Sequence, residues 1–183
     1  RIAPSERGAL EELTFEPLNR SAPGPGEVEI QVQASGLGFR DVLIALDMYP
    51  GERTLGSECS GVNSAVGPGV TGLQPGDEVF AMAPGCFASH VVTPAAFVCR
   101  KPAHLSMAEA AALPSAFLTA IYALQHLGKL QAGERVLIHA AAGGVGQAAL
   151  QIALNAGAEV FATAGSPQKR ALLKSLGAHH VFD

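Results

Sequence analysis

The sequence predicts an α/β protein in two parts, a β-barrel domain followed by part of a doubly wound parallel sheet. Up to Arg100, short segments alternate between apolar and polar residues and are separated by turns rich in Gly and Pro, as in antiparallel strands. After Pro102 the apolar spacing becomes helical, and strands then alternate with helices. The expected domains are residues 1–105 and residues 106–183, the second including linker helices.

The clearest strand of the first part runs from Glu27 to Ser35, where apolar residues alternate with Glu and Gln. This period of two places one face on a core and the other in water. Turn-rich stretches at Pro23–Gly26 and Gly67–Asp77 separate it from its neighbours. Further strands are expected at Gly61–Val66, Asp77–Ala83 and Ala88–Arg100.

Two helices are expected to link the parts. Ser106 and Glu109 have the spacing of a capping box, and Pro114 should end or kink the helix that they begin. A second helix is expected from about Ser115 to Leu127, with Gly128 as its stop.

The remainder follows a βαβαβ order. Ser166 is expected to cap the second helix of this part, with Pro167 at its first position and Gly177 at its end. Right-handed crossovers make such strands parallel, and the third strand leaves the sheet unfinished. The expected elements are strands at Arg135–Ala140, Glu159–Ala164 and His179–Asp183, and a helix at Gly144–Ala156 closed by Gly157.

Composition excludes several function classes. A net charge of −4 with interspersed signs gives no basic surface for nucleic acid or an anionic membrane. The sequence lacks an apolar run long enough to span a bilayer and a secretory signal, so a cytoplasmic location is expected. The three cysteines, Cys59, Cys86 and Cys99, fit free thiols better than a disulfide framework or a zinc pair.

A glycine-rich loop follows the strand that begins at Arg135 and opens a helix, which is the context of a dinucleotide-binding fingerprint. Aligned on that fingerprint, Ala141 takes the tight-turn position, Gly143 admits the pyrophosphate and Gly146 allows close packing of helix and strand. The helix amino terminus offers N–H groups to phosphate. The residues predicted to bind the cofactor here are Ala142, Gly143, Gly144, Val145 and Gly146.

The end of the second strand predicts which nucleotide is preferred. NAD-specific folds place an acidic residue there, about 20 residues after the glycines, to bind the ribose 2′-hydroxyl. No carboxylate stands at Ala164 or Gly165, whereas Ser166, Lys169 and Arg170 suit a 2′-phosphate. NADPH is therefore the predicted cofactor, with a solvated helix face as the alternative for the two basic residues.

Two stretches, GLGFRDVLIALDMYPGE at Gly36–Glu52 and HAAAGGVG at His139–Gly146, carry a family resemblance. The chain resembles, over essentially its whole length, the enoyl reductase domains of polyketide synthases in the medium-chain dehydrogenase/reductase superfamily. The resemblance implies a GroES-like β barrel followed by a Rossmann domain. It also implies NADPH-dependent reduction of an enoyl thioester carried on an acyl carrier protein during polyketide chain extension, next to other synthase domains.

The resemblance assigns roles to two further residues. Tyr49 matches the position at which family members carry the tyrosine regarded as the α-carbon proton donor, and simple packing of the ring is the alternative. Thr119 matches a threonine near the nicotinamide, and bonding to its own helix backbone is the alternative. Arg40 and Asp41 are interpreted as structural, either bonding each other or capping the following helix.

The chain departs from related patterns at three points. Gly38 replaces the usual Asn, no His precedes Glu58 as in zinc-dependent relatives, and the family's lysine and aspartate belong to a later segment. We therefore expect a metal-free site, and we expect this chain to be inactive alone. Two alternatives are a free-standing NADPH-dependent quinone or enone oxidoreductase and a catalytically silent structural domain.

Overall fold

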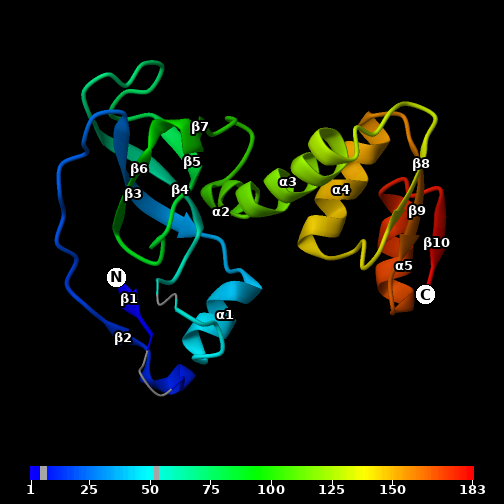
Figure 1. Cartoon of the computed structure of the whole chain (residues 1–183), viewed down its shortest axis with the longest axis horizontal. Helices are drawn as coiled ribbons and strands as arrows, with labels where there is room; N and C mark the ends of the chain where they lie inside the picture. Colours follow the sequence, from blue (N-terminus) through cyan, green and yellow to red (C-terminus); the bar gives the residue numbers. More distant parts are fainter. Residues whose placement is uncertain (5–7, 52–53) are drawn as a thin grey trace. The chain divides into compact units, whose positions relative to one another are not determined.

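The computed structural model describes residues 1–4, 8–51 and 54–183, and it divides the chain into two compact units, Arg1–Pro114 and Ser115–Asp183 (Figure 1). Helix α2 (Met107–Ala111) lies in the first unit, where the Ser60 hydroxyl donates to the Met107 carbonyl at 2.6 Å. The units thus meet later in the chain than the expected 105/106 boundary, and the division into folding domains stays a prediction. Glu52, the last residue of the first resemblance stretch, lies outside the described residues.

An antiparallel sheet of five strands forms the first unit, in the order β6-β3-β4-β5-β7. Strand β3, which pairs with β6 and β4, has the predicted bounds, and its apolar residues Val28 and Ile30 are fully buried. Glu29, expected on the face in water, is also buried, because it pairs with Arg20. The strands are β3 (Glu27–Ser35), β4 (Glu58–Val66), β5 (Glu78–Met82), β6 (His90–Pro94) and β7 (Val98–Arg100).

The prediction of a single strand over Ala88–Arg100 is wrong, because the structure has two strands there, β6 and β7. β6 pairs with β3 at one edge of the sheet, while β7 pairs with β5 at the other edge, so the chain has to cross between them. It does so through a 3₁₀ turn at Ala95–Phe97, which follows Pro94. A proline has no N–H to extend a ladder.

The barrel prediction is supported in part. β3 carries two register shifts, at Glu29/Ile30 and Val32/Ala34, and such bulges bend and twist a strand. No pairing joins β6 to β7 within the described residues, so the structure shows a GroES-like unit with an open sheet and no closed barrel. The remaining elements of this unit are β1 (Ile2–Ala3), η1 (Leu10–Glu12), β2 (Thr14–Phe15) and α1 (Phe39–Ala45).

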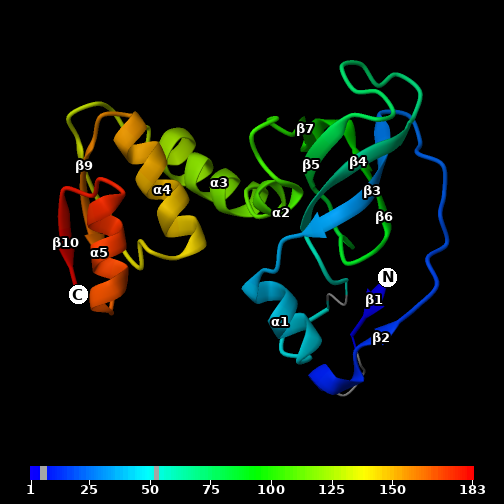
Figure 2. The same cartoon turned by 180° about the vertical axis from the view of Figure 1, so that it is seen from behind.

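The second unit is the expected βαβαβ arrangement. Its three strands are parallel, in the order β10-β9-β8, and α4 and α5 lie on the same side of them (Figures 1 and 2). This is the start of a Rossmann sheet. The elements are β8 (Arg135–Ile138), α4 (Gly144–Asn155), β9 (Glu159–Thr163), α5 (Pro167–Ser175) and β10 (His180–Phe182).

Within the described residues, helices cover one face of this parallel sheet and leave apolar side chains exposed on the other. Val160 and Ala162 are fully buried beneath the helices, with Leu150 of α4 in the same core. On the opposite face, Leu137 and Phe182 are 56% and 51% exposed. We call the face that carries Leu137, Phe161 and Phe182 the bare face.

The linker helices follow the predicted capping, with one change of geometry. Ser106 and Glu109 form the predicted capping box, with the Ser106 N–H donating to the Glu109 carboxylate at 2.8 Å. The expected helix from Ser115 begins at Pro114 as α3 (Pro114–Ile121) and continues as a π-helix, η3 (Tyr122–Leu127), that stops at Gly128. No helix of the described ranges is long and apolar enough to cross a membrane.

Candidate cofactor and active site

The glycine loop begins with a backbone conformation that side chains seldom adopt. Ala140, just after β8, has φ of 49°, in the left-handed region. A Cβ built on Gly146 would lie 2.5 Å from the Cα of Ala141, which is itself fully buried. Gly146 is therefore the point of close packing, while the tight turn falls at Ala140, one residue before the position assigned from the motif.

Thr163 braces this loop from the end of β9. Its carbonyl accepts the Ala141 N–H at 2.9 Å, and its hydroxyl oxygen accepts the Ala140 N–H at 3.2 Å. The His139 ring nitrogen Nδ1 lies 3.3 Å from the same hydroxyl, so His139 also has a structural partner. Thr163 was not identified from the sequence. Because the predicted strands are parallel, the end of β9 could have been expected to lie beside the loop that follows β8.

The loop has the shape that a pyrophosphate requires. Gly143 is the N-cap residue of α4, and no described side chain caps that helix, so its first N–H groups face outward. Gly143, Gly144 and Val145 are exposed, and a Cβ on Gly144 would meet nothing within 4 Å. With the positive end of the helix dipole there, these residues fit a dinucleotide.

The predicted 2′-phosphate residues gather beyond the end of β9. Ser166 caps α5, accepting the Lys169 N–H at 3.3 Å through its hydroxyl oxygen. Arg170 donates from Nη1 to the Ala164 carbonyl at 2.8 Å, which ties its guanidinium to the strand end. Lys169 is exposed in the first turn of α5. The fold thus brings all three to the carboxyl edge of the sheet, where such folds bind nucleotides.

Thr119 lies on an exposed position of α3, whereas Ala120 beside it packs into the core of the second unit. Tyr49 belongs to the first unit, in the segment that follows α1, and its side chain is 39% exposed. The Arg40 guanidinium carbon lies 6.0 Å from the centre of the Tyr49 ring. The roles of Thr119 and Tyr49 stay predictions.

Asp41 caps α1, which was one of the two structural roles expected for it. Its carboxylate accepts the Gly38 N–H at 2.8 Å, and its other oxygen accepts the Gly56 N–H at 2.8 Å. The contact with Gly56, which follows the segment that carries Tyr49, could not be predicted from the sequence. Gly38 itself contributes only its backbone.

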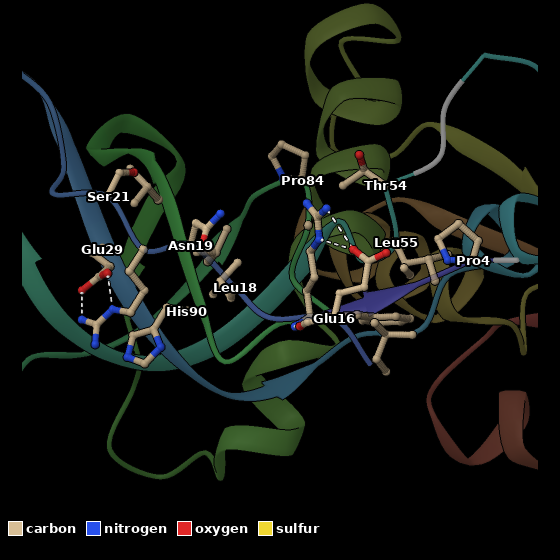
Figure 3. Close-up of a pocket in the computed structure, with 18 residues that line it drawn as sticks. Pro4, Glu16, Leu18, Asn19, Ser21, Glu29, Thr54, Leu55, Pro84 and His90 are labelled. Atoms are coloured by element: carbon tan, nitrogen blue, oxygen red, sulfur yellow. Dashed lines mark hydrogen bonds and ion pairs between the residues drawn. The ribbon is translucent and has the colours of Figure 1, made fainter. Parts of the chain in front are cut away.

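A cavity of about 620 Å³ lies elsewhere in the first unit and contains none of the predicted site residues (Figure 3). Two of its charged residues pair with each other: Arg20 bonds both oxygens of the buried Glu29 at 2.9 and 2.7 Å, and Ser64 donates to the same carboxylate at 2.6 Å. The Arg20 hydrogen bonds hold the pKa of Glu29 below its ordinary range. Among the described residues that line this cavity, Arg1 likewise pairs with Glu16, at 3.1 Å.

Metal ligands do not cluster in the part of the chain that the structure describes, where no group of three or more His, Cys, Asp or Glu side chains could hold an ion. Cys59 and Cys86 are buried free thiols, and a hydrogen bond with Cys59, together with burial, raises the pKa of the Cys86 thiol. The metal-free site stays a prediction.

Comparison with known proteins identifies the class. The family model described as "Alcohol dehydrogenase GroES-like domain" matches residues 24–122, and the one described as "Zinc-binding dehydrogenase" matches residues 144–183. The chain therefore belongs to the GroES-like alcohol dehydrogenase family, within the medium-chain dehydrogenase/reductase superfamily of oxidoreductases.

Individual relatives narrow this class. The chain is 47% identical over 181 residues to a "Mycocerosic acid synthase-like polyketide synthase" of Mycobacterium tuberculosis, covering 96% of this chain and 9% of that protein. It is 49% identical to the CurK enoyl reductase, with a TM-score of 0.91, over 98% of this chain and 58% of that one. The chain is thus homologous to the enoyl reductase domains of polyketide synthases, and it spans little more than half of the solved domain.

Two more distant structures cover the whole chain. A quinone oxidoreductase of Pseudomonas syringae is 38% identical, with a TM-score of 0.86, and the chain spans 58% of it. A mycobacterial protein solved as a complex with NADPH is 34% identical, with a TM-score of 0.88 and the same 58% coverage. Proteins of this fold therefore include at least one that binds NADPH.

Proposed function

We propose that this chain is the substrate-facing and cofactor-binding part of an enoyl reductase that acts on acyl-carrier-bound thioesters within a polyketide synthase. The observation that carries the proposal is the identity to synthase enoyl reductase domains over 96–98% of the chain. The open glycine loop and the basic first turn of α5 support it, because both suit NADPH.

The proposed binding residues act on different parts of the nucleotide. The glycine loop, Ala142 to Gly146, holds the pyrophosphate through backbone N–H groups at the start of α4, while the Gly143 N–H donates to the Ala140 carbonyl at 2.9 Å and closes the turn. Ser166, Lys169 and Arg170 hold the 2′-phosphate. Thr119 lies against the nicotinamide. NADPH, when bound, supplies the hydride.

The proposed chemistry needs no metal ion. Hydride addition to the β carbon of an α,β-unsaturated thioester moves an electron pair onto the thioester oxygen as an enolate, which hydrogen-bond donors can stabilise. The Tyr49 O–H bond then breaks as a C–H bond forms at the α carbon, and the phenolate regains a proton from solvent.

The test uses the complete reductase domain that contains this sequence, an α-methyl enoyl thioester and NADPH. We expect reduction, and we expect Tyr49→Phe and Tyr49→Val to change the α-methyl configuration while lowering the rate by no more than about 100-fold to 10,000-fold. Unchanged configuration in both variants would remove Tyr49 from the mechanism.

The same assay separates the alternatives. Turnover of quinones or simple enones at a higher kcat/KM than the thioester would favour a free-standing oxidoreductase, the class of the Pseudomonas relative. Tight NADPH binding with no turnover of either substrate would indicate a silent domain. Stoichiometric zinc in the purified protein whose removal abolishes reduction would contradict the metal-free mechanism.

A further inference from the structure

One buried carboxylate holds both ends of the segment that carries Tyr49. Asp41 is only 1% exposed, and its two oxygens accept N–H groups at 2.8 Å from Gly38, just before α1, and from Gly56, just before β4. Asp41 therefore bonds the backbone on both sides of Tyr49, and we call the described residues between these contacts, 39–51 and 54–55, the Tyr49 loop.

The Gly56 end of this loop cannot move independently. Gly56 has φ of 83°, and an added Cβ would lie 2.5 Å from the backbone nitrogen of Phe87. Its carbonyl accepts the Gly85 N–H at 2.8 Å, and the neighbouring Leu55 carbonyl accepts the Phe87 N–H at 3.3 Å. Asp41 thus joins the start of α1 to a backbone position that is already fixed.

The adjacent residue on the same helix reaches the Tyr49 ring. Arg40 places its guanidinium carbon 6.0 Å from the ring centre, the outer limit of a cation–π contact. Its buried Nε has no hydrogen-bond partner among the described residues. The contact with the Tyr49 ring is therefore the interaction of this side chain on which the inference depends.

We propose that Arg40 and Asp41 are positioning residues for Tyr49. Asp41 closes the base of the loop and Arg40 orients the ring, so that the phenol meets the substrate from one side only. Neither residue needs to touch the substrate. The inference rests on the proposed function, in which Tyr49 is the proton donor.

The two acceptor oxygens of Asp41 suggest a substitution that removes one hydrogen bond and keeps the size of the side chain. Two N–H donors face Asp41, and an aspartate supplies an acceptor oxygen to each. Asp41→Asn keeps the size but turns one acceptor into an NH₂ donor, which then faces an N–H group. The loop base should open on one side without loss of side-chain volume.

The experiment compares four variants of the complete reductase domain with NADPH and an α-methyl enoyl thioester: Asp41→Asn, Arg40→Gln, Tyr49→Phe and the double variant Asp41→Asn/Tyr49→Phe. Asp77→Asn is the control outside the loop, because Asp77 also accepts a backbone N–H, that of Gln74 at 2.9 Å, although it pairs with Arg100 at 2.9 Å as well. NADPH affinity and thermal melting report on folding.

We expect Asp41→Asn and Arg40→Gln to give mixed α-methyl configuration and to lower kcat by up to about 100-fold, the cost of a small misplacement. In the Tyr49→Phe background, Asp41→Asn should have no further effect on configuration, since residues that act together are not additive. Asp77→Asn should leave configuration unchanged.

The proposal would be overturned if Asp41→Asn and Arg40→Gln both retained the α-methyl configuration. It would also be overturned if Asp41→Asn changed the configuration equally with and without the Tyr49→Phe substitution. If Asp41→Asn fails to fold, Arg40→Gln decides, because it leaves the loop base intact. Two results would instead count against the proposed function itself. They are absent thioester reduction by the unaltered domain and unchanged α-methyl configuration in Tyr49→Phe.

Discussion

Two glycines of the cofactor loop, only two positions apart, have different constraints. A Cβ at Gly146 would meet backbone atoms of Ala141 at 2.5 Å, whereas a Cβ at Gly144 would meet nothing within 4 Å. Gly146→Ala should therefore lower the free energy of unfolding of the second unit by about 1–3 kcal/mol, the usual cost of overpacking.

Gly144→Ala is the matched comparison. It should change the free energy of unfolding by less than about 0.5 kcal/mol, but it should weaken NADPH binding because its methyl group points into the open loop. Urea unfolding and a nucleotide titration of both variants test this contrast. Equal stability of the two variants would contradict the close packing at Gly146.

The Arg20–Glu29 pair predicts sensitivity to acid. The pKa of Glu29 is lowered in the folded state, chiefly by Arg20. A lowered carboxyl pKa contributes stability that is fully present above the unfolded value of about 4.3 and is lost as the pH falls through the folded value. Glu29→Gln should flatten the dependence of the melting temperature on pH below about 4.3, and an unchanged acid slope would show that this pair contributes nothing.

At the scale of elements, the first turn of α5 supplies the proposed 2′-phosphate site and its last turn supplies a control. Lys169→Ala should weaken NADPH binding by about 1–3 kcal/mol, or roughly 5-fold to 150-fold, and leave NADH binding unchanged. Lys174→Ala, in the last turn of the same helix, should alter neither affinity. Binding titrations with both nucleotides decide, and equal or better NADH binding by the unaltered protein would refute the NADPH preference.

At the scale of the whole molecule, the uncovered side of the parallel sheet limits how this chain behaves alone. Leu137 and Phe182 are more than half exposed, and Phe161 stacks on Phe182 at 6.5 Å between ring centres. Phe161 also stacks on His180, which bonds Glu159, so polar side chains interrupt the apolar ones on this face. Exposed apolar side chains such as Leu137 and Phe182 still bind hydrophobic dyes and promote association.

We therefore expect the isolated chain to bind such a dye, to associate and to show no reductase activity, with backbone amides of the second unit exchanging faster than those of β3 and β4. Leu137→Lys should reduce association because it charges the bare face. Hydrogen exchange and light scattering measure these outcomes. A monomeric, cooperatively melting chain with normal activity would refute this expectation.

The amino-acid sequence alone determined the order and type of most elements and the character of the cofactor loop. Period-two alternation set β3, the Ser106 and Ser166 caps set the starts of α2 and α5, and the glycine pattern identified the packing point at Gly146. These are local signals, since each depends on residues within a few positions of one another along the chain.

Tertiary structure alone decided the contacts between distant residues. The split of β6 from β7 follows from pairing at opposite edges of the sheet, and the Thr163 brace joins residues from neighbouring strand ends. The Asp41 bond to Gly56 likewise depends on how the chain returns after α1. These contacts join residues far apart in the chain, so they exist only in the folded backbone. The spacing of apolar residues along the sequence does not indicate which strand edge or which amide a side chain will meet.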